Sequence, residues 1–260
     1  MANLIRSAKS GSDWTINELD AYNIVVTVQD VATFFGNPIL LQPSVHQVIL
    51  DNEMYPDGGI ADKRDRLFFY YLEDAMAIPP GEESAVDDFS AHLLSMLQYD
   101  DPDNRYIRQR KDIPFFICGT DSYAKTDVCI MDRKLRILLL VQEDKRHMEP
   151  KDPEPQLIAE AIAAFQYNNS ALKKRGLQPL AQRTIPGITM IGSTPTFYKI
   201  TVTQDLIAAI QVGQYPETPT IVHRLLLPVA NIVTLPNYGM RPLKNRAVIL
   251  RCFEAFKQFL

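Results

Sequence analysis

Three residues near the middle of the chain, Asp127, Glu143 and Lys145, have types and a spacing that suit metal-dependent hydrolysis. Asp127 lies in one apolar segment, and the next apolar segment ends in Glu143 and Lys145, with a turn expected over 133–136. If this hairpin turns about Leu135, Asp127 lies opposite Glu143, and period-two alternation brings Lys145 to the same face. Two converging carboxylates suit Mg²⁺ or Mn²⁺, and a lysine beside them can orient or deprotonate an attacking water. The set is therefore chemically sufficient for phosphodiester hydrolysis.

Helical and strand patterns around these residues predict an α/β fold. From residue 84 the expected order is helix, three strands, helix and strand, followed by further elements. The expected helices span 13–22, 63–78, 84–99, 152–169, 205–212 and 245–260. The expected strands span 24–29, 113–119, 126–131, 136–145, 188–192 and 196–202. On the expected hairpin, the face of Asp127 also carries Cys129, Met131, Ile137, Leu139 and Val141. The other face is apolar too, so helices are expected to cover both.

The stretch from Asp127 to Glu143-Asp144-Lys145 resembles the PD-(D/E)xK restriction-endonuclease-like superfamily, although Thr126 stands where the name-giving proline would be. That family has an αβββαβ core, a mixed sheet flanked by helices, which is the order expected above. The resemblance implies that Asp127 and Glu143 bind Mg²⁺ and that Lys145 assists the nucleophilic water.

In this family the helix after the hairpin often supplies a glutamine, and the first helix supplies a glutamate. The residues at the matching places are Gln156, which shares a helical stripe with Glu160, and Glu83, which would be a third metal ligand. The resemblance implies nucleic acid as the partner, and a homodimer is compatible with it. The stretch from Asp127 to Phe165 also looks like a group of proteins from mushroom-forming fungi that carries no established activity.

Composition and charge disfavour a nucleic-acid-coating protein, a membrane-spanning protein and a disulfide-rich protein. The formal net charge of −4 argues against a protein that coats nucleic acid, whereas an enzyme that touches a few phosphates through a metal needs less positive charge. A basic cluster at Arg105, Arg108, Arg110 and Lys111, expected just before the first core strand, could follow a nucleic-acid backbone, but nearby aspartates largely offset it. No apolar run approaches the roughly 18–20 residues that span a bilayer. The three cysteines are too scattered for a disulfide framework, which favours the cytoplasm or the nucleus.

The sequence also predicts how the chain is divided into parts, and it leaves two alternative functions open. Residues 1–83 are expected to form an accessory α+β extension packed on an endonuclease-like core of residues 84–260. One alternative is a catalytically inactive module in which Asp127, Glu143 and Lys145 form a closed salt bridge. A two-carboxylate glycoside hydrolase is the other alternative, but Lys145 beside both carboxylates disfavours the protonated acid that such an enzyme needs.

Overall fold

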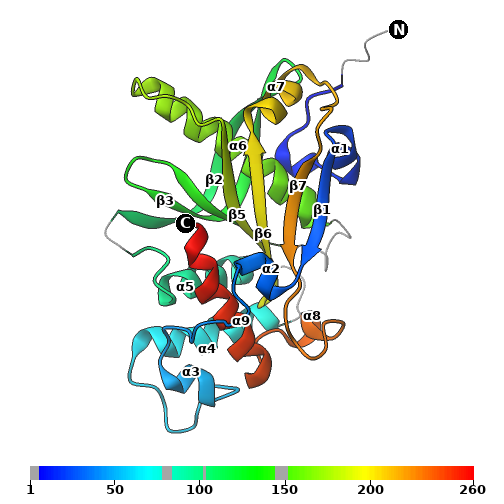
Figure 1. Cartoon of the computed structure of the whole chain (residues 1–260). Coiled ribbons are helices and arrows are strands. Elements are labelled where there is room, and N and C mark those ends of the chain that lie inside the picture. The colour runs from blue at the N-terminus through cyan, green and yellow to red at the C-terminus, as the bar shows by residue number, and fades with distance from the viewer. Residues whose placement is uncertain (1–5, 78–83, 102–103, 144–151) are drawn as a thin grey trace.

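Apolar runs of strand length form one mixed sheet of seven strands, in the order β1-β7-β6-β5-β4-β3-β2 (Figure 1). The structure is a computed structural model that describes residues 6–77, 84–101, 104–143 and 152–260. Its strands are β1 (Ile24–Gln29), β2 (Arg105–Ile117), β3 (Thr120–Asp132), β4 (Ile137–Glu143), β5 (Gln182–Ile191), β6 (Thr194–Thr203) and β7 (Thr220–Leu225). The expected α/β class with a mixed, helix-flanked sheet is confirmed.

Helices cover both faces of this sheet, as the apolar character of both hairpin faces predicts. They are α1 (Ile16–Ala21), α2 (Val31–Phe35), α3 (Gln47–Asp51), α4 (Lys63–Met76), α5 (Ser84–Met96), α6 (Pro153–Lys174), α7 (Gln204–Val212), α8 (Leu235–Tyr238) and α9 (Leu243–Phe256), with short 3-10 turns η1 (Gly11–Asp13) and η2 (Lys257–Phe259). Among the helices of the described ranges, none combines the length and the apolar composition needed to cross a bilayer.

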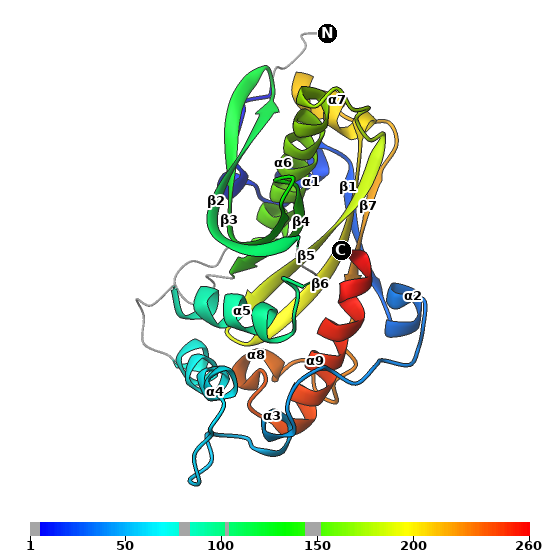
Figure 2. The same ribbon diagram turned by 90° about the vertical axis from the view of Figure 1, so that its left-hand side faces the viewer.

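The two faces of the sheet build two separate apolar cores. One core packs against α6, which runs along the sheet where β2 and β3 curl over it (Figure 2). The other core joins α4, α5 and α9 to the opposite face. Helix α6 begins where predicted, because the Asp152 side chain accepts the Glu154 backbone N–H at 3.0 Å and Pro153 occupies the first turn. Gly187 lets α6 approach closely, since a Cβ at that position would lie 3.0 Å from Leu157.

From α5 onward the elements follow the order α5, β2, β3, β4, α6, β5, which agrees with the order predicted from the sequence. Strands β2, β3 and β4 form an antiparallel meander, and α6 then crosses over so that β5 lies parallel to β4. Parallel neighbours require such a crossover, usually a helix. The C-terminal end of β4, which carries Glu143, therefore lies beside the chain's entry into α6.

The sheet extends further than the sequence predicts at both edges. Strand β2 begins at Arg105 rather than at Ile113, so the basic cluster expected to precede this strand lies within it. At the other edge, β7 was not predicted, and β1 from the N-terminal part pairs with it in parallel. Strand β1 itself lies where the sequence predicts a strand, at 24–29. The first half of β2 and the short strand β7 were missed because many of their positions are partly or fully exposed, and such strands show weak hydrophobic patterning.

Candidate metal centre

Asp127 lies at a break in the pairing of β2 with β3. Gln109 pairs with Val128 and Lys111 pairs with Thr126 in one register, while Arg110 and Asp127 between them are not paired. Arg110 has a left-handed backbone with φ of 50°, which a non-glycine residue adopts uncommonly. Such a local irregularity redirects side chains, as β-bulges next to active sites do.

At this break, side chains replace the backbone in the pairing of β3 with β4. The backbone N–H of Glu143 donates to Asp127 Oδ2 at 2.9 Å, and Thr126 Oγ1 donates to the Val141 carbonyl at 3.2 Å. The Thr126 hydroxyl also lies 3.1 Å from the Val128 carbonyl oxygen. These contacts hold the Asp127 carboxylate next to the backbone of Glu143, the last residue of β4.

Three carboxylates converge there. Asp87 on α5, Asp127 on β3 and Glu143 on β4 each offer one oxygen, and these oxygens all lie within 4.8 Å of one another. Asp87 is buried, with 9% of its surface exposed, whereas Asp127 and Glu143 are partly exposed. The predicted convergence of Asp127 with Glu143 is confirmed, and Asp87 completes a set of hard oxygen donors that fits a divalent cation.

The predicted register that led to this convergence is wrong. Val128 pairs with Val141 and Cys129 with Leu140, and a register shift follows Ile130. This register places Asp127 level with Gln142 rather than with Glu143. A one-residue slip exchanges the two faces of a strand.

The predicted face assignment of β4 is correct for Ile137 and Leu138 but wrong from Leu139 to Val141. Cys129 and Met131 pack with Leu140 in the core under α6, whereas Leu139 and Val141 belong to the core under α5. Asp127 and Glu143 meet because of the break at Asp127 and not because they share a face of the sheet.

Two other predicted site residues, Lys145 and Glu83, lie outside the residues that the structure describes. Sequence reasoning missed Asp87, which is one helical turn after Glu83 on the expected helix. Residues four apart share a helix face, so Asp87 could have been considered together with Glu83. Asp87 also lies among the inward residues Val86 and Phe89, and a charged residue at such a position indicates a candidate site residue.

Helix α6 adds a second layer behind Asp127. The predicted residue Gln156 donates to Glu160 Oε1 at 3.3 Å, and Glu160 is fully buried. Burial raises the pKa of Glu160 well above its ordinary value, and the nearby charge of Asp127 raises it further. Within the described chain, Glu160 Oε2 has no hydrogen-bond partner. The neutral form of Glu160 is therefore favoured next to a carboxylate that faces the cluster.

The first turn of α6 is tied to the far side of the sheet by an ion pair. Glu154 Oε2 accepts from Arg224 Nη1 on β7 at 2.9 Å. Burial raises the pKa of Glu154, and the charge of Arg224 opposes that rise. Tyr198 on β6 lies in the same group, and burial with the charge of Glu154 raises its pKa. This arrangement fixes the start of α6, and with it Gln156, relative to the strands.

A second group with metal-ligand chemistry, His46, Asp62 and Asp65, has a structural explanation. Asp62 caps α4 by accepting the backbone N–H groups of Arg64 and Asp65 at 2.8 and 3.0 Å. His46 Nδ1 lies 2.6 Å from Asp65 Oδ2. These contacts account for the group without a cation.

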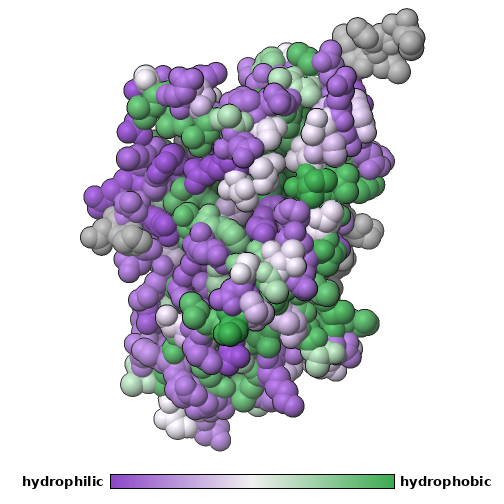
Figure 3. Space-filling model, viewed as in Figure 1, coloured by the Kyte–Doolittle hydropathy of each residue, from purple (hydrophilic) through white to green (hydrophobic). Residues whose placement is uncertain are grey.

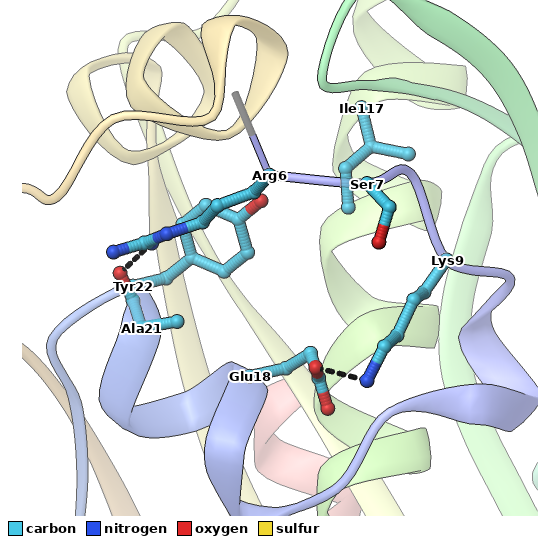
Figure 4. A pocket seen from close by; sticks show the side chains of 7 residues that line it. All are labelled: Arg6, Ser7, Lys9, Glu18, Ala21, Tyr22 and Ile117. Atoms are coloured by element: carbon cyan, nitrogen blue, oxygen red, sulfur yellow. Dashed lines mark hydrogen bonds and ion pairs between the residues drawn. The ribbon is translucent and has the colours of Figure 1, made fainter. Parts of the chain in front are cut away.

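A pocket of about 210 Å³ lies between the N-terminal segment and α1, apart from the three carboxylates (Figure 4). Its cations are already engaged, because Arg6 donates to the Ala21 carbonyl and Lys9 pairs with Glu18. The charged groups of this pocket therefore do not converge on one point as the three carboxylates do.

Comparison with models of protein families gives no match for this chain, and comparison with curated proteins gives none either. The functional argument therefore rests on the geometry of Asp87, Asp127 and Glu143, on the layer of Gln156 and Glu160 behind them, and on the order of the elements that carry them.

Proposed function

We propose that this protein is a metal-dependent nuclease that hydrolyses phosphodiester bonds of DNA or RNA. The observation that carries the proposal is the meeting of three carboxylate oxygens within 4.8 Å, contributed by Asp87, Asp127 and Glu143. The order α5, β2, β3, β4, α6, β5, with β4 parallel to β5, supports an endonuclease-like core. Both features agree with the PD-(D/E)xK resemblance.

In this proposal the three carboxylates hold Mg²⁺ or Mn²⁺. The cation supplies polarisation of the scissile phosphate and a lowered pKa of bound water. Lys145, close in sequence to Glu143, assists the attacking water, as the resemblance implies. Thr126 and the Glu143 backbone N–H hold Asp127 in place, and Gln156 with Glu160 packs behind it. Precise positioning of ligands by such neighbours tunes metal affinity.

A glycoside hydrolase fits the described residues less well. Such an enzyme needs one protonated and one ionised carboxyl group flanking its substrate. Glu160 has the raised pKa expected of the acid, but it is fully buried and cannot reach a substrate. The carboxyl pair of Glu160 and Asp127 therefore lacks the access that glycoside hydrolysis requires.

A cleavage assay tests the proposal. Purified full-length protein is incubated with labelled single-stranded DNA, duplex DNA and RNA, with Mg²⁺, with Mn²⁺ or with EDTA. We expect cleavage that requires the cation and that Asp127→Asn, Asp87→Asn and Lys145→Ala each reduce by at least 100-fold, since each removes a group assigned to the reacting centre.

Asp88→Asn is the matched control, because Asp88 is the exposed neighbour of Asp87 on α5 and its replacement removes the same charge. If the wild-type protein cleaves none of the three substrates with either cation, the catalytically inactive binding module is the better description. If Asp87→Asn and Asp88→Asn lose the same fraction of cleavage activity, the activity does not depend on the carboxylate cluster.

A further inference from the structure

Four cations lie along β2 next to Asp127, and we define Arg105, Arg108, Arg110 and Lys111 as the β2 basic strip. Strand β2 is the last strand of the sheet on that side. Arg108 and Arg110 are exposed, and Arg105 and Lys111 are partly exposed. Figure 3 shows mainly hydrophilic residues at this edge of the molecule.

The strip lies close to the carboxylate cluster. Arg108 pairs in register with Cys129, Lys111 pairs with Thr126, and Arg110 lies level with Asp127 itself. Neighbouring strands are about 4.8 Å apart, so the strip runs one strand away from Asp127. The six residue-to-residue steps from Arg105 to Lys111 span at most about 20 Å, the axial length of about six nucleotides on one strand of a duplex.

Two members of the strip face the α6 side of the sheet. Lys111 Nζ lies 4.7 Å from the ring centre of Tyr167 on α6. Burial raises the pKa of the Cys129 thiol to about 12, and the charges of Lys111 and Arg108 oppose that rise. Both cations therefore lie over the same part of the sheet as this buried thiol.

The strip retains its positive charge for a ligand. Across the described parts of the chain, the salt bridges engage other residues, and no acidic side chain pairs with a member of the strip. Of the acids nearby, Asp132 is bound by Arg136 through its side chain at 2.6 Å.

The C-terminal half of β2, beyond the β2 basic strip, is covered by contacts with α6. Gln166 on α6 donates to the Phe116 carbonyl at 3.1 Å and accepts the Phe116 N–H at 2.9 Å, and Pro114 has no N–H to offer. These features cover the edge of β2 beyond the strip. Charged residues on an edge strand also discourage pairing with another sheet, which is the competing explanation of the strip.

We infer that the β2 basic strip binds the phosphate backbone of a nucleic acid and leads it to the carboxylate cluster. This inference rests on the proposed function for the reaction, but the binding itself does not require cleavage. Phosphate contacts fix the position of a strand without reading its sequence, and they make affinity depend on salt. The inference therefore predicts binding that is weakly selective for sequence and steeply dependent on salt.

The test measures fluorescence anisotropy of labelled single-stranded DNA, duplex DNA and RNA in EDTA, from 50 to 300 mM salt. The variant is Arg108→Gln with Lys111→Gln, and its matched control is Arg241→Gln with Lys244→Gln, exposed cations at the start of α9. Two lost duplex contacts lower the slope of log K against log salt by about 1.8 and lower affinity at 0.1 M salt by about 60-fold. The control should match the wild type.

Equal binding by the strip variant and its control overturns the inference. A strip variant that keeps its affinity for nucleic acid but self-associates in sedimentation also overturns it, because the cations then protect the sheet edge. The proposed function can fail separately. A wild-type protein that binds through the strip but cleaves nothing with Mg²⁺ or Mn²⁺ supports the inference and refutes the nuclease.

Discussion

The substitution Asp127→Asn separates the metal-binding role of Asp127 from its role in the fold. Asparagine keeps an oxygen that can accept the Glu143 backbone N–H, now accepted by Asp127 at 2.9 Å, but it removes the charge. In EDTA we therefore expect thermal unfolding within about 2 °C of the wild type, since one preserved hydrogen bond is worth roughly 1 kcal/mol.

The rise in melting temperature on addition of a cation should differ sharply between the wild type and Asp127→Asn. The carboxylate oxygens lie within 4.8 Å of one another, so like charges on two of them repel by an amount on the order of 3 kcal/mol at an effective dielectric constant of 20, before solvent and other partners reduce it. A bound cation relieves that repulsion. At a cation concentration of about 100 times Kd, binding stabilises the folded state by about 2.7 kcal/mol, which raises Tm by about 5–11 °C.

Loss of one charged ligand should weaken binding by about 100-fold, at the upper end of the range for removal of a group that supports a metal ligand. At the same cation concentration the stabilisation then falls to about 0.4 kcal/mol, and the rise in Tm falls to about 1–2 °C. The assay is a thermal unfolding series in EDTA, Mg²⁺ and Mn²⁺ for the wild type, Asp127→Asn and Asp87→Asn.

Asp88→Asn should respond to the cation as the wild type does, because Asp88 is exposed and lies outside the cluster. An unchanged cation response in both Asp127→Asn and Asp87→Asn would refute the reasoning. Asp62→Asn then identifies the source, because asparagine preserves the α4 cap, and loss of the response in this variant would assign the cation to the group around His46.

Three further substitutions test the surroundings of the site and the fold. Burial holds the pKa of Glu160 well above its ordinary 4.5, so the folded state keeps a proton that the unfolded chain releases above that pH. The wild type should therefore lose stability relative to Glu160→Gln as the pH rises above 4.5, by up to about 1.4 kcal/mol per pH unit in urea titrations with EDTA. Glu154→Gln weakens the ion pair with the partly exposed Arg224 and should lower the urea-derived stability by about 1 kcal/mol. Arg246→Met removes a fully buried guanidinium that donates to several backbone carbonyls and should lower the free energy of unfolding by at least about 3 kcal/mol.

Elements with strong local patterns were predictable from the sequence. Strand β4 was predictable because helices cover both of its faces, so the run from Ile137 to Val141 contains no polar residue. The start of α6 was predictable because Asp152 caps it and Pro153 suits its first turn. The turn expected over 133–136 is present as well, and the Asp132 carboxylate accepts the backbone N–H groups of Lys134 and Arg136 there, both at 2.9 Å.

The register around the site could not be predicted, because it depends on local backbone conformations and side-chain contacts. The left-handed Arg110 and the shift after Ile130 change which residues share a face, and a period-two pattern carries no record of either. The predicted pairing of Asp127 with Glu143 failed for that reason, although the two carboxylates still meet. Asp87 was missed because its approach depends on how α5 packs across the sheet, which is a long-range feature.

The position of Asp87 gives a further argument for function. It is one of the inward residues of α5, whose others include Val86, Phe89 and Leu93, and a site that served only stability would favour an apolar side chain there. Instead the chain places a third acid within 4.8 Å of two others, at the boundary between its two apolar cores. Departures from the rules of stable packing are expected at functional sites. A cation bound at this boundary would join α5 to β3 and β4, so metal binding and the packing of α5 on the sheet should be thermodynamically linked.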